Sequence, residues 1–134
     1  MLLSLLPLLL YTLYFLALDL TWIALAVTPL YQQTLQSGFR GLDNLVDIGI
    51  ALAVYCLLLA GNLVLNAHAL TPNRTVYEAT LYGTMYGIVV YGVYSGTNYI
   101  VFPQWSLILL ATDILWGAFL CGSSLALFAY LNSV

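Results

Sequence analysis

Two aspartates stand inside apolar segments, and each is followed three residues later by a tryptophan. Asp19 and Trp22 lie in the first apolar segment, and Asp113 and Trp116 lie in the last. A carboxylate in hydrocarbon costs about 3 kcal/mol or more, so such a residue is normally kept for a reason. Residues three apart share a helical face, so each aspartate lies on the same side as its tryptophan. These paired motifs are the first candidates for a functional site.

The chemistry open to such a pair follows from its surroundings. Two carboxylates in one low-dielectric layer do not both stay ionised, so we expect a shared or exchangeable proton between Asp19 and Asp113. A site of this kind would suit proton-linked binding of a small or cationic substrate, or acid–base catalysis. The alternative is that both groups are protonated and only link neighbouring helices by hydrogen bonds.

The composition identifies the solvent of this chain as a lipid bilayer. Of 134 residues, 63% are hydrophobic and 5% are charged, against about 25% charged in a typical soluble domain. The mean hydropathy is +1.02. The net charge is −3, from two arginines and five acids, and the sequence contains no lysine. This balance argues against nucleic acid as a partner and against a polybasic anchor on anionic lipid.

The apolar segments predict an all-α integral membrane protein, a four-transmembrane-helix up-down bundle forming a single domain over residues 1–134. A span needs about 20 residues to cross the hydrocarbon core. The first segment lacks the positive flank of a cleaved signal peptide, so we expect it to be retained. Thr28-Pro29 is predicted to end the first helix, and the connection 28–44 has room for a short helix at the membrane interface. The four predicted spans are approximately 2–26, 45–70, 76–101 and 106–131.

The up-down order predicts where the polar side chains meet. Both termini fall on one side of the membrane, and the connections 28–44 and 102–105 fall on the other. At a helical rise of about 1.5 Å per residue, Asp19 and Asp113 both lie roughly 10 Å below that second surface. Two further polar residues lie a few residues in from the same surface. We therefore expect one polar layer made of Asp19, Asp47, Asn98 and Asp113.

The third segment carries a stripe of small and polar residues on one helical face. Gly83 and Gly87 form one small-x-x-x-small pair, and Gly92 and Gly96 form another, a spacing that favours close helix packing. Further along the first stripe come tyrosine hydroxyls and an amide, which need partners in lipid. The candidate binding residues are accordingly Asp19, Trp22, Asp47, Tyr91, Tyr94, Asn98, Asp113 and Trp116.

Metal and cofactor chemistry find little support in the sequence. Cys56 and Cys121 each lie midway through an apolar segment, where cysteine is usually a small packing residue. The single histidine, His68, lies toward the opposite side from the aspartates and is not expected to bind a metal. We predict no cofactor and no metal. Arg40 and Arg74 fall on opposite sides of the membrane, so orientation is nearly tied, with a weak preference for cytoplasmic termini.

Four stretches together resemble a family of predicted small bacterial membrane proteins with four spans, catalogued as a domain of unknown function. The stretches are Leu18 to Trp22, Leu30-Tyr31-Gln32, Tyr91 to Asn98 and Asp113 to Gly117. The resemblance implies a bacterial inner-membrane protein and brings no established activity. The family pattern has an acid after the second tyrosine of the third-span motif, and here that position is Ser95.

Three classes of function are compatible with these features. The first is a unit that binds or moves a small substrate with proton linkage, and a path through so small a unit would need a dimer. The second is an accessory or assembly subunit of a larger membrane complex. The third is a lipid-modifying enzyme that uses the Asp pair, and the lack of any Ser-His, Cys-His or phosphate-loop motif argues against it. The expected partners are the bilayer itself and either a second copy or a larger complex.

Overall fold

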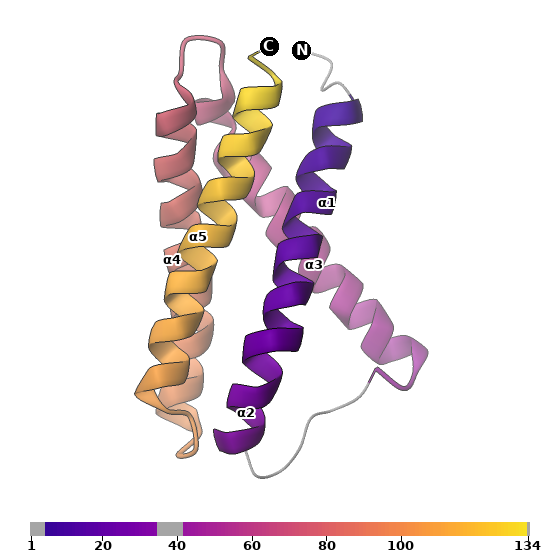
Figure 1. Cartoon of the computed structure of the whole chain (residues 1–134), viewed down its shortest axis with the longest axis vertical. Helices are drawn as coiled ribbons and strands as arrows, with labels where there is room; N and C mark the ends of the chain where they lie inside the picture. The colour runs from indigo at the N-terminus through magenta and orange to yellow at the C-terminus, as the bar shows by residue number, and fades with distance from the viewer. Residues whose placement is uncertain (1–4, 35–41, 134) are drawn as a thin grey trace.

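The computed structural model describes residues 5–34 and 42–133. Within these residues, 87% are helical and none belongs to a strand. The helical segments run mostly along one long axis, except for a long helix that lies at an angle to it (Figure 1). They are α1 (Leu5–Trp22), the π-helical turn η1 (Ile23–Val27), α2 (Thr28–Thr34), α3 (Leu45–Leu65), the 3-10 turn η2 (Ala67–Leu70), α4 (Val76–Val101) and α5 (Leu107–Leu131).

The first helix does not end at Thr28-Pro29, contrary to the prediction from the sequence. It continues through η1 into α2 and ends at Thr34. The backbone N–H of Thr28 donates to the carbonyl of Ile23, five residues earlier, and the Thr28 hydroxyl donates to the same carbonyl at 2.9 Å. Proline lacks an N–H, and its ring crowds the preceding turn of a regular helix. The wider π-turn relieves that crowding, so the chain passes the proline without breaking.

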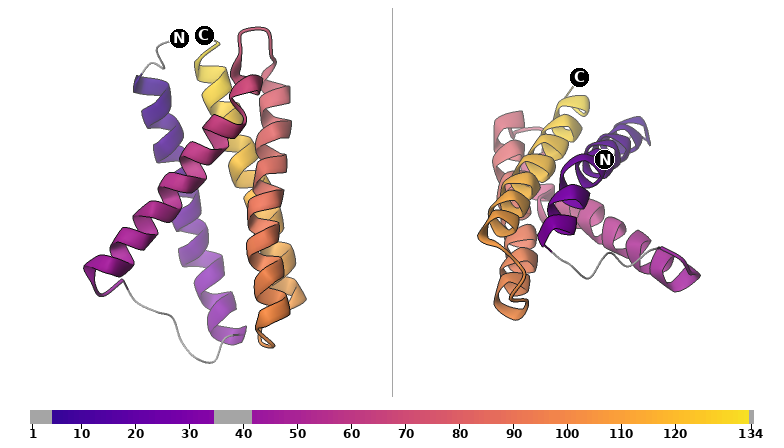
Figure 2. Two further views of the ribbon diagram at one scale, coloured as in Figure 1. Left: turned by 180° about the vertical axis from the view of Figure 1, so that it is seen from behind. Right: turned by 60° about the horizontal axis from the view of Figure 1, so that its bottom comes forward.

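The helices α4 and α5 form a closely packed antiparallel hairpin, side by side in both ribbon views (Figures 1 and 2). A Cβ atom at Gly83 would lie 2.6 Å from the carbonyl oxygen of Cys121, and one at Gly87 would overlap the carbonyl of Gly117. Gly92 and Gly96 have no such close neighbour, because the nearest atom to a Cβ at Gly92 is 3.9 Å away and Gly96 faces open space. The first glycine pair therefore sets the separation of the two helices.

The start of α4 is fixed by its first residues. The Thr75 hydroxyl accepts the backbone N–H of Glu78, and the Glu78 carboxylate accepts the backbone N–H of Thr75, which together form a capping box. Arg74 pairs with Glu78 at 2.7 Å, and hydrogen bonding to that carboxylate raises the pKa of Arg74. The charged groups at this end thus stabilise the turn that reverses the chain into the hairpin.

The helix α3 diverges from the other three long helices. Its C-terminal end lies against them, and its N-terminal end points away (Figures 1 and 2). One of its contacts is made by Asn62, whose side-chain amide donates to the carbonyl of Cys121 at 3.1 Å. Across the whole helix, Asp47 and Asn62 are the buried residues. Most of α3 therefore presents its apolar side chains outward.

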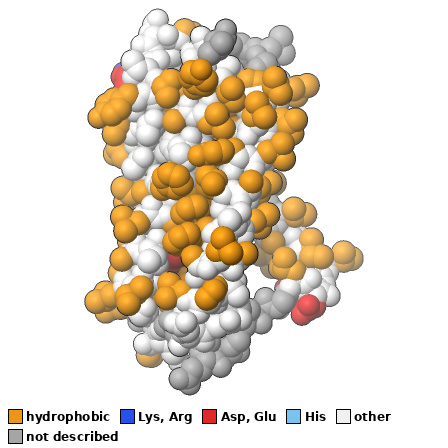
Figure 3. Space-filling view, viewed as in Figure 1, with side chains coloured by type: hydrophobic (Ala, Val, Ile, Leu, Met, Phe, Trp, Pro, Cys, Tyr) orange, Lys and Arg blue, Asp and Glu red, His pale blue; other side chains and the backbone are white. Residues whose placement is uncertain are grey.

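Within the described residues, three helices are long and apolar enough to cross a membrane, namely Leu5–Gln33, Leu45–Leu65 and Leu107–Leu131. The expectation of four spans is supported for these three. The fourth helix, α4, has 26 residues, but its tyrosines and glycines lower its hydropathy. Hydrophobic side chains are spread over the visible face of the molecule, and charged side chains show at only a few points on it (Figure 3), as expected when lipid replaces water around the helices.

Candidate functional site

Asp19 lies where three helices meet. Its carboxylate accepts a hydrogen bond from the hydroxyl of Tyr55 on α3 at 2.8 Å and one from the indole N–H of Trp116 on α5 at 2.9 Å. The side chain is nearly buried, with 6% of its surface exposed. Both partners are neutral donors, so the described contacts bring no positive charge to this carboxylate.

Asp113 is also held by a hydrogen bond, from a residue of the first helix where that helix continues into α2. Its carboxylate accepts a hydrogen bond from the hydroxyl of Tyr31 on α2, at 3.1 Å to one oxygen. Its exposed fraction is 7%. Tyr31 reaches this position because the helix continues past Pro29, so the π-turn is what connects the first helix to the second carboxylate.

The two tryptophans of the Asp-x-x-Trp motifs stack on each other. The rings of Trp22 and Trp116 lie 4.6 Å apart between centroids, with an angle of 8° between their planes. Tyr91 from α4 lies close enough to interact electrostatically with both Asp19 and Asp113. The first and last long helices thus present matching motifs to each other, and α4 closes one side.

These groups line one cleft of about 520 Å³, which we call the aspartate cleft. Six of the eight candidate binding residues face it, together with four residues of the first helix. Its lining consists of Asp19, Trp22, Ile23, Val27, Thr28, Tyr31, Tyr91, Tyr94, Asp113 and Trp116. The described lining contains no basic side chain. Carboxylates beside aromatic faces form a surface that is complementary to a cation or a hydrogen-bond donor.

The other two candidates, Asp47 and Asn98, do not line the aspartate cleft. Asp47 lies in the first turn of α3, where its carboxylate accepts from the Asn44 amide at 2.6 Å and its backbone N–H donates to Asn44 at 3.0 Å. The divergence of α3 carries Asp47 sideways from the cleft. Asn98 interacts with Tyr94, whose hydroxyl also interacts with Tyr31.

Two residues of the site, Tyr31 and Tyr55, are not among the candidates that the sequence suggests. Tyr31 falls in a stretch that resembles an interfacial connection, and Tyr55 is an ordinary aromatic residue in the middle of an apolar helix. Tyr31 does carry a signal, because it belongs to one of the stretches on which the family resemblance rests. Tyr55 carries none.

Ser95 lies beside the site on α4. It is fully buried, and its hydroxyl accepts a hydrogen bond from the indole N–H of Trp105 at 2.9 Å. It also interacts with Asp113. Trp105 packs edge-on against Tyr31, with ring centroids 5.1 Å apart. An acid at position 95 would therefore stand next to Asp113, whereas serine keeps this wall neutral.

A second polar cluster lies toward the other end of the bundle, and we call it the asparagine cluster. The Asn66 amide donates to both the backbone and the side-chain oxygen of Asn62, at 2.9 and 3.0 Å. Asn62 donates onward to the Cys121 carbonyl, and the Tyr11 hydroxyl donates to the carbonyl of Leu59 at 3.1 Å. These side chains are buried and link α1, α3 and α5.

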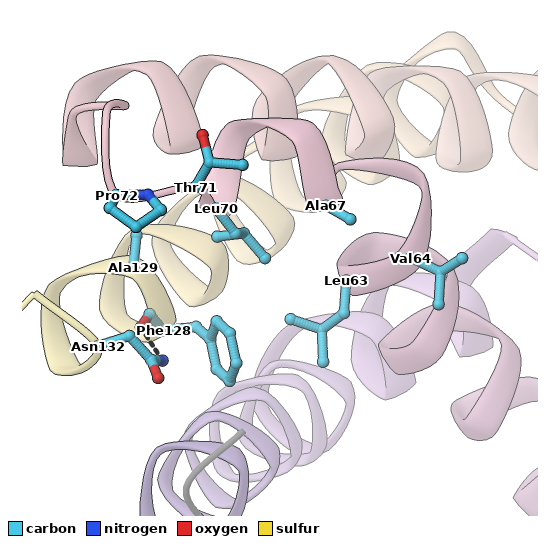
Figure 4. Close-up of a pocket in the computed structure, with 9 residues that line it drawn as sticks. All are labelled: Leu63, Val64, Ala67, Leu70, Thr71, Pro72, Phe128, Ala129 and Asn132. Carbon is cyan, nitrogen blue, oxygen red and sulfur yellow. Dashed lines mark hydrogen bonds between the residues drawn. The ribbon is translucent and has the colours of Figure 1, made fainter. Parts of the chain in front are cut away.

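A separate groove of about 490 Å³ opens near this end, between η2 and the last turns of α3 and α5 (Figure 4). Its lining is largely apolar. Asn132 is its main polar residue, and the side-chain amide of Asn132 donates to the carbonyl of Phe128 at 2.8 Å. That amide caps α5, so the groove lacks converging groups that could carry out chemistry.

No group of three or more His, Cys, Asp or Glu residues that could hold a metal ion occurs in the described parts of the chain. His68 packs edge-on against Tyr82, with ring centroids 4.4 Å apart. Cys56 is exposed on α3 and Cys121 is buried on α5, and both are free thiols.

Residues 4–131 match the family described as "Predicted membrane protein (DUF2177)". The match covers nearly the whole chain, so this protein belongs to that family of membrane proteins of unknown function. No curated protein and no solved structure matches the chain. The family is one of predicted membrane proteins, and the apolar helices fit that description. What the site does has to be argued from the geometry above.

Proposed function

We propose that α4 is a fourth membrane span, so that the chain forms a four-helix bundle in the bacterial inner membrane with both termini in the cytoplasm. A helix of 26 residues is about 39 Å long, against roughly 30 Å of hydrocarbon. The start of α1 and the end of α5 lie at the same end of the bundle (Figure 1), which fits an even number of crossings. Close pairing with α5 would shelter its less hydrophobic residues.

The aspartate cleft, in this proposal, binds or moves a small substrate with proton linkage. The observation that carries it is that Asp19 and Asp113, from opposite ends of the chain, line a single cleft of about 520 Å³. Carboxylates that served only as links between helices would be expected to sit in closely packed surroundings, because protein interiors contain few voids larger than a water molecule. Here space remains beside both of them.

Proton linkage follows from the charge of the cleft. Two carboxylates surrounded by neutral donors in hydrocarbon are stabilised when one of them takes up a proton or when a cation enters. The two ligands therefore compete for the same negative charge. A bound cation would displace a proton, and a rise in pH would favour the cation.

The test is proton release on ligand binding, measured with a pH indicator in weakly buffered nanodisc samples. Propylamine, which is protonated at neutral pH, serves as a small probe cation. We expect a release of protons that saturates with propylamine, decreases as the starting pH is raised, and disappears in Asp19→Asn and Asp113→Asn. Asp43→Asn is the matched control, because Asp43 is exposed before the start of α3. Equal release from all four proteins would contradict the proposal.

An accessory subunit of a larger membrane complex is the second candidate, and the exposure of α3 supports it. Along this helix, large side chains such as Leu52 and Leu57 are 62% and 73% exposed. Lipid alone would also cover these side chains, so the mass of the extracted particle has to show whether a partner protein is bound. Extraction in a mild detergent followed by native mass spectrometry would favour the subunit if the chain leaves the membrane only with other proteins.

A further inference from the structure

The aspartate cleft does not end at Asp19. A groove of about 410 Å³ lies on the other side of this residue, between α3 and α4. Four residues line both cavities, so the two share a wall. The shared residues are Asp19, Ile23, Tyr91 and Tyr94. We call the second cavity the α3–α4 groove.

The two cavities differ in chemistry. Beyond the shared residues, Tyr55 lines the α3–α4 groove together with apolar side chains, which are Ala51, Val54, Leu58 and Val90. The aspartate cleft adds the second carboxylate and the stacked indole pair. The hydrogen bonds of Asp19 reflect this division, because Tyr55 of the groove and Trp116 of the cleft each donate to one of its oxygens.

The α3–α4 groove also opens sideways. Val54 on its α3 wall is 48% exposed, and Tyr94 on its α4 wall is 54% exposed. This side of the bundle is where α3 diverges from its neighbours (Figure 2). In a membrane, the surface next to these residues is hydrocarbon, so an alkyl chain could enter from the bilayer without crossing water.

We propose that the substrate is an amphipathic amine, with its ammonium group in the aspartate cleft and a single alkyl chain in the α3–α4 groove. This inference rests on the proposed function and specifies its substrate class. The charge of the cleft selects the head, because two carboxylates attract an ammonium and repel a carboxylate or phosphate. Aromatic faces beside the carboxylates add to that preference. The apolar lining of the groove selects the chain.

Chain length alone does not test this inference. A bilayer solvates an alkyl chain about as well as an apolar groove does, and a long amine also concentrates in the lipid. The informative change is a steric block in the groove. Ala51→Leu adds volume on its α3 wall, and Ala53→Leu makes the same change on an exposed position of the same helix. Val90→Phe blocks the groove independently from α4.

The experiment measures quenching of tryptophan fluorescence in nanodiscs by propylamine and decylamine, with partition into empty discs determined in parallel. We expect propylamine to bind the wild type and all three variants alike. Decylamine binding should weaken roughly tenfold or more in Ala51→Leu and Val90→Phe, because the chain no longer fits, and should be unchanged in Ala53→Leu.

The different failures are distinguishable. If decylamine binds both blocked variants as tightly as Ala53→Leu, the groove does not hold the chain and this inference is overturned, while propylamine binding leaves the proposed function standing. If decanol binds as tightly as decylamine, the inference that the cleft selects an ammonium group is overturned. If propylamine does not bind the wild type, the aspartate cleft is not a cation site and the proposed function fails with it.

Discussion

The asparagine cluster and the aspartate cleft lie toward opposite ends of the same bundle and join the same helices in different ways. In the asparagine cluster, Asn62 is fully buried and Asn66 is 6% exposed, and their amides bond to each other and to the backbone of α5. In the aspartate cleft, Asp19 and Asp113 are bonded by neutral donors but border an open volume.

This difference teaches how to separate structural from functional polar groups inside a membrane. Interhelical polar contacts contribute modestly to stability when their partners are satisfied, by about 0.6 kcal/mol on average. The asparagine cluster has the closed form expected of such contacts. The aspartate cleft instead has two ionisable carboxylates, although amide side chains could also link the helices there, and open space lies beside them. We therefore infer that the asparagine cluster holds the helices together and that the aspartate cleft binds a ligand.

The largest expected effect is on the packing of α4 against α5, which both the asparagine cluster and the aspartate cleft depend on. Gly87→Leu places a side chain where the carbonyl of Gly117 lies, so α4 and α5 must separate. We expect a loss of stability of about 3 kcal/mol or more, with ligand binding lost as well, measured by thermal unfolding in detergent. Gly96→Ala is the matched control, because nothing lies near its Cβ position. A stable Gly87→Leu protein would show that the hairpin is not packed as described.

A smaller effect separates the two clusters. Asn62→Leu keeps the size of the side chain but removes the donor to the Cys121 carbonyl and the acceptor for Asn66. The Asn66 amide keeps its hydrogen bond to the backbone oxygen of Asn62, so the expected cost is that of the lost bond to α5, about 1–1.5 kcal/mol. Thermal unfolding should therefore shift down while propylamine affinity at the other end stays the same. If affinity fell as much as stability, the two polar regions would act as one unit and the comparison would fail.

The smallest expected effect concerns the hydroxyl of Tyr31, which lies beside Asp113 because the π-turn lets the first helix continue. Tyr31→Phe removes the hydroxyl that donates to Asp113 and keeps the ring against Trp105. The expected loss of stability is about 1 kcal/mol or less, and propylamine affinity should change by a few fold. Tyr77→Phe is the control, since Tyr77 is 70% exposed at the far end of α4. If both variants had the same stability and the same propylamine affinity, Tyr31 would not contribute to the site.

The helical membrane fold and the meeting of the two Asp-x-x-Trp motifs are both predictable from the sequence. Helical rise fixes the depth of a residue, so the residue numbers alone place Asp19 and Asp113 at one level. Depth carries no information about sideways position, however. Asp47 is expected in the layer for this reason, and the divergence of α3 carries it away from the aspartate cleft.

The other differences have local causes. Thr28-Pro29 is typical of a helix end, because proline removes a hydrogen bond and crowds the preceding turn. A π-turn solves both problems, and no residue pattern before the proline indicates it. The contribution of Tyr31 to the site depends on that turn. The role of Tyr55 depends on how α3 crosses α1, which is a matter of tertiary packing.

The most direct test of the functional assignment is the protonation of Asp19 and Asp113, followed by infrared carboxyl bands in nanodiscs between about pH 5 and pH 9. Asp19→Asn and Asp113→Asn assign the bands. Our account predicts a protonated carboxyl band that shrinks as the pH rises, and that shrinks at constant pH when propylamine is added. A band that responds to neither, together with variants altered only in thermal stability, would show that both aspartates are structural links like the asparagine cluster.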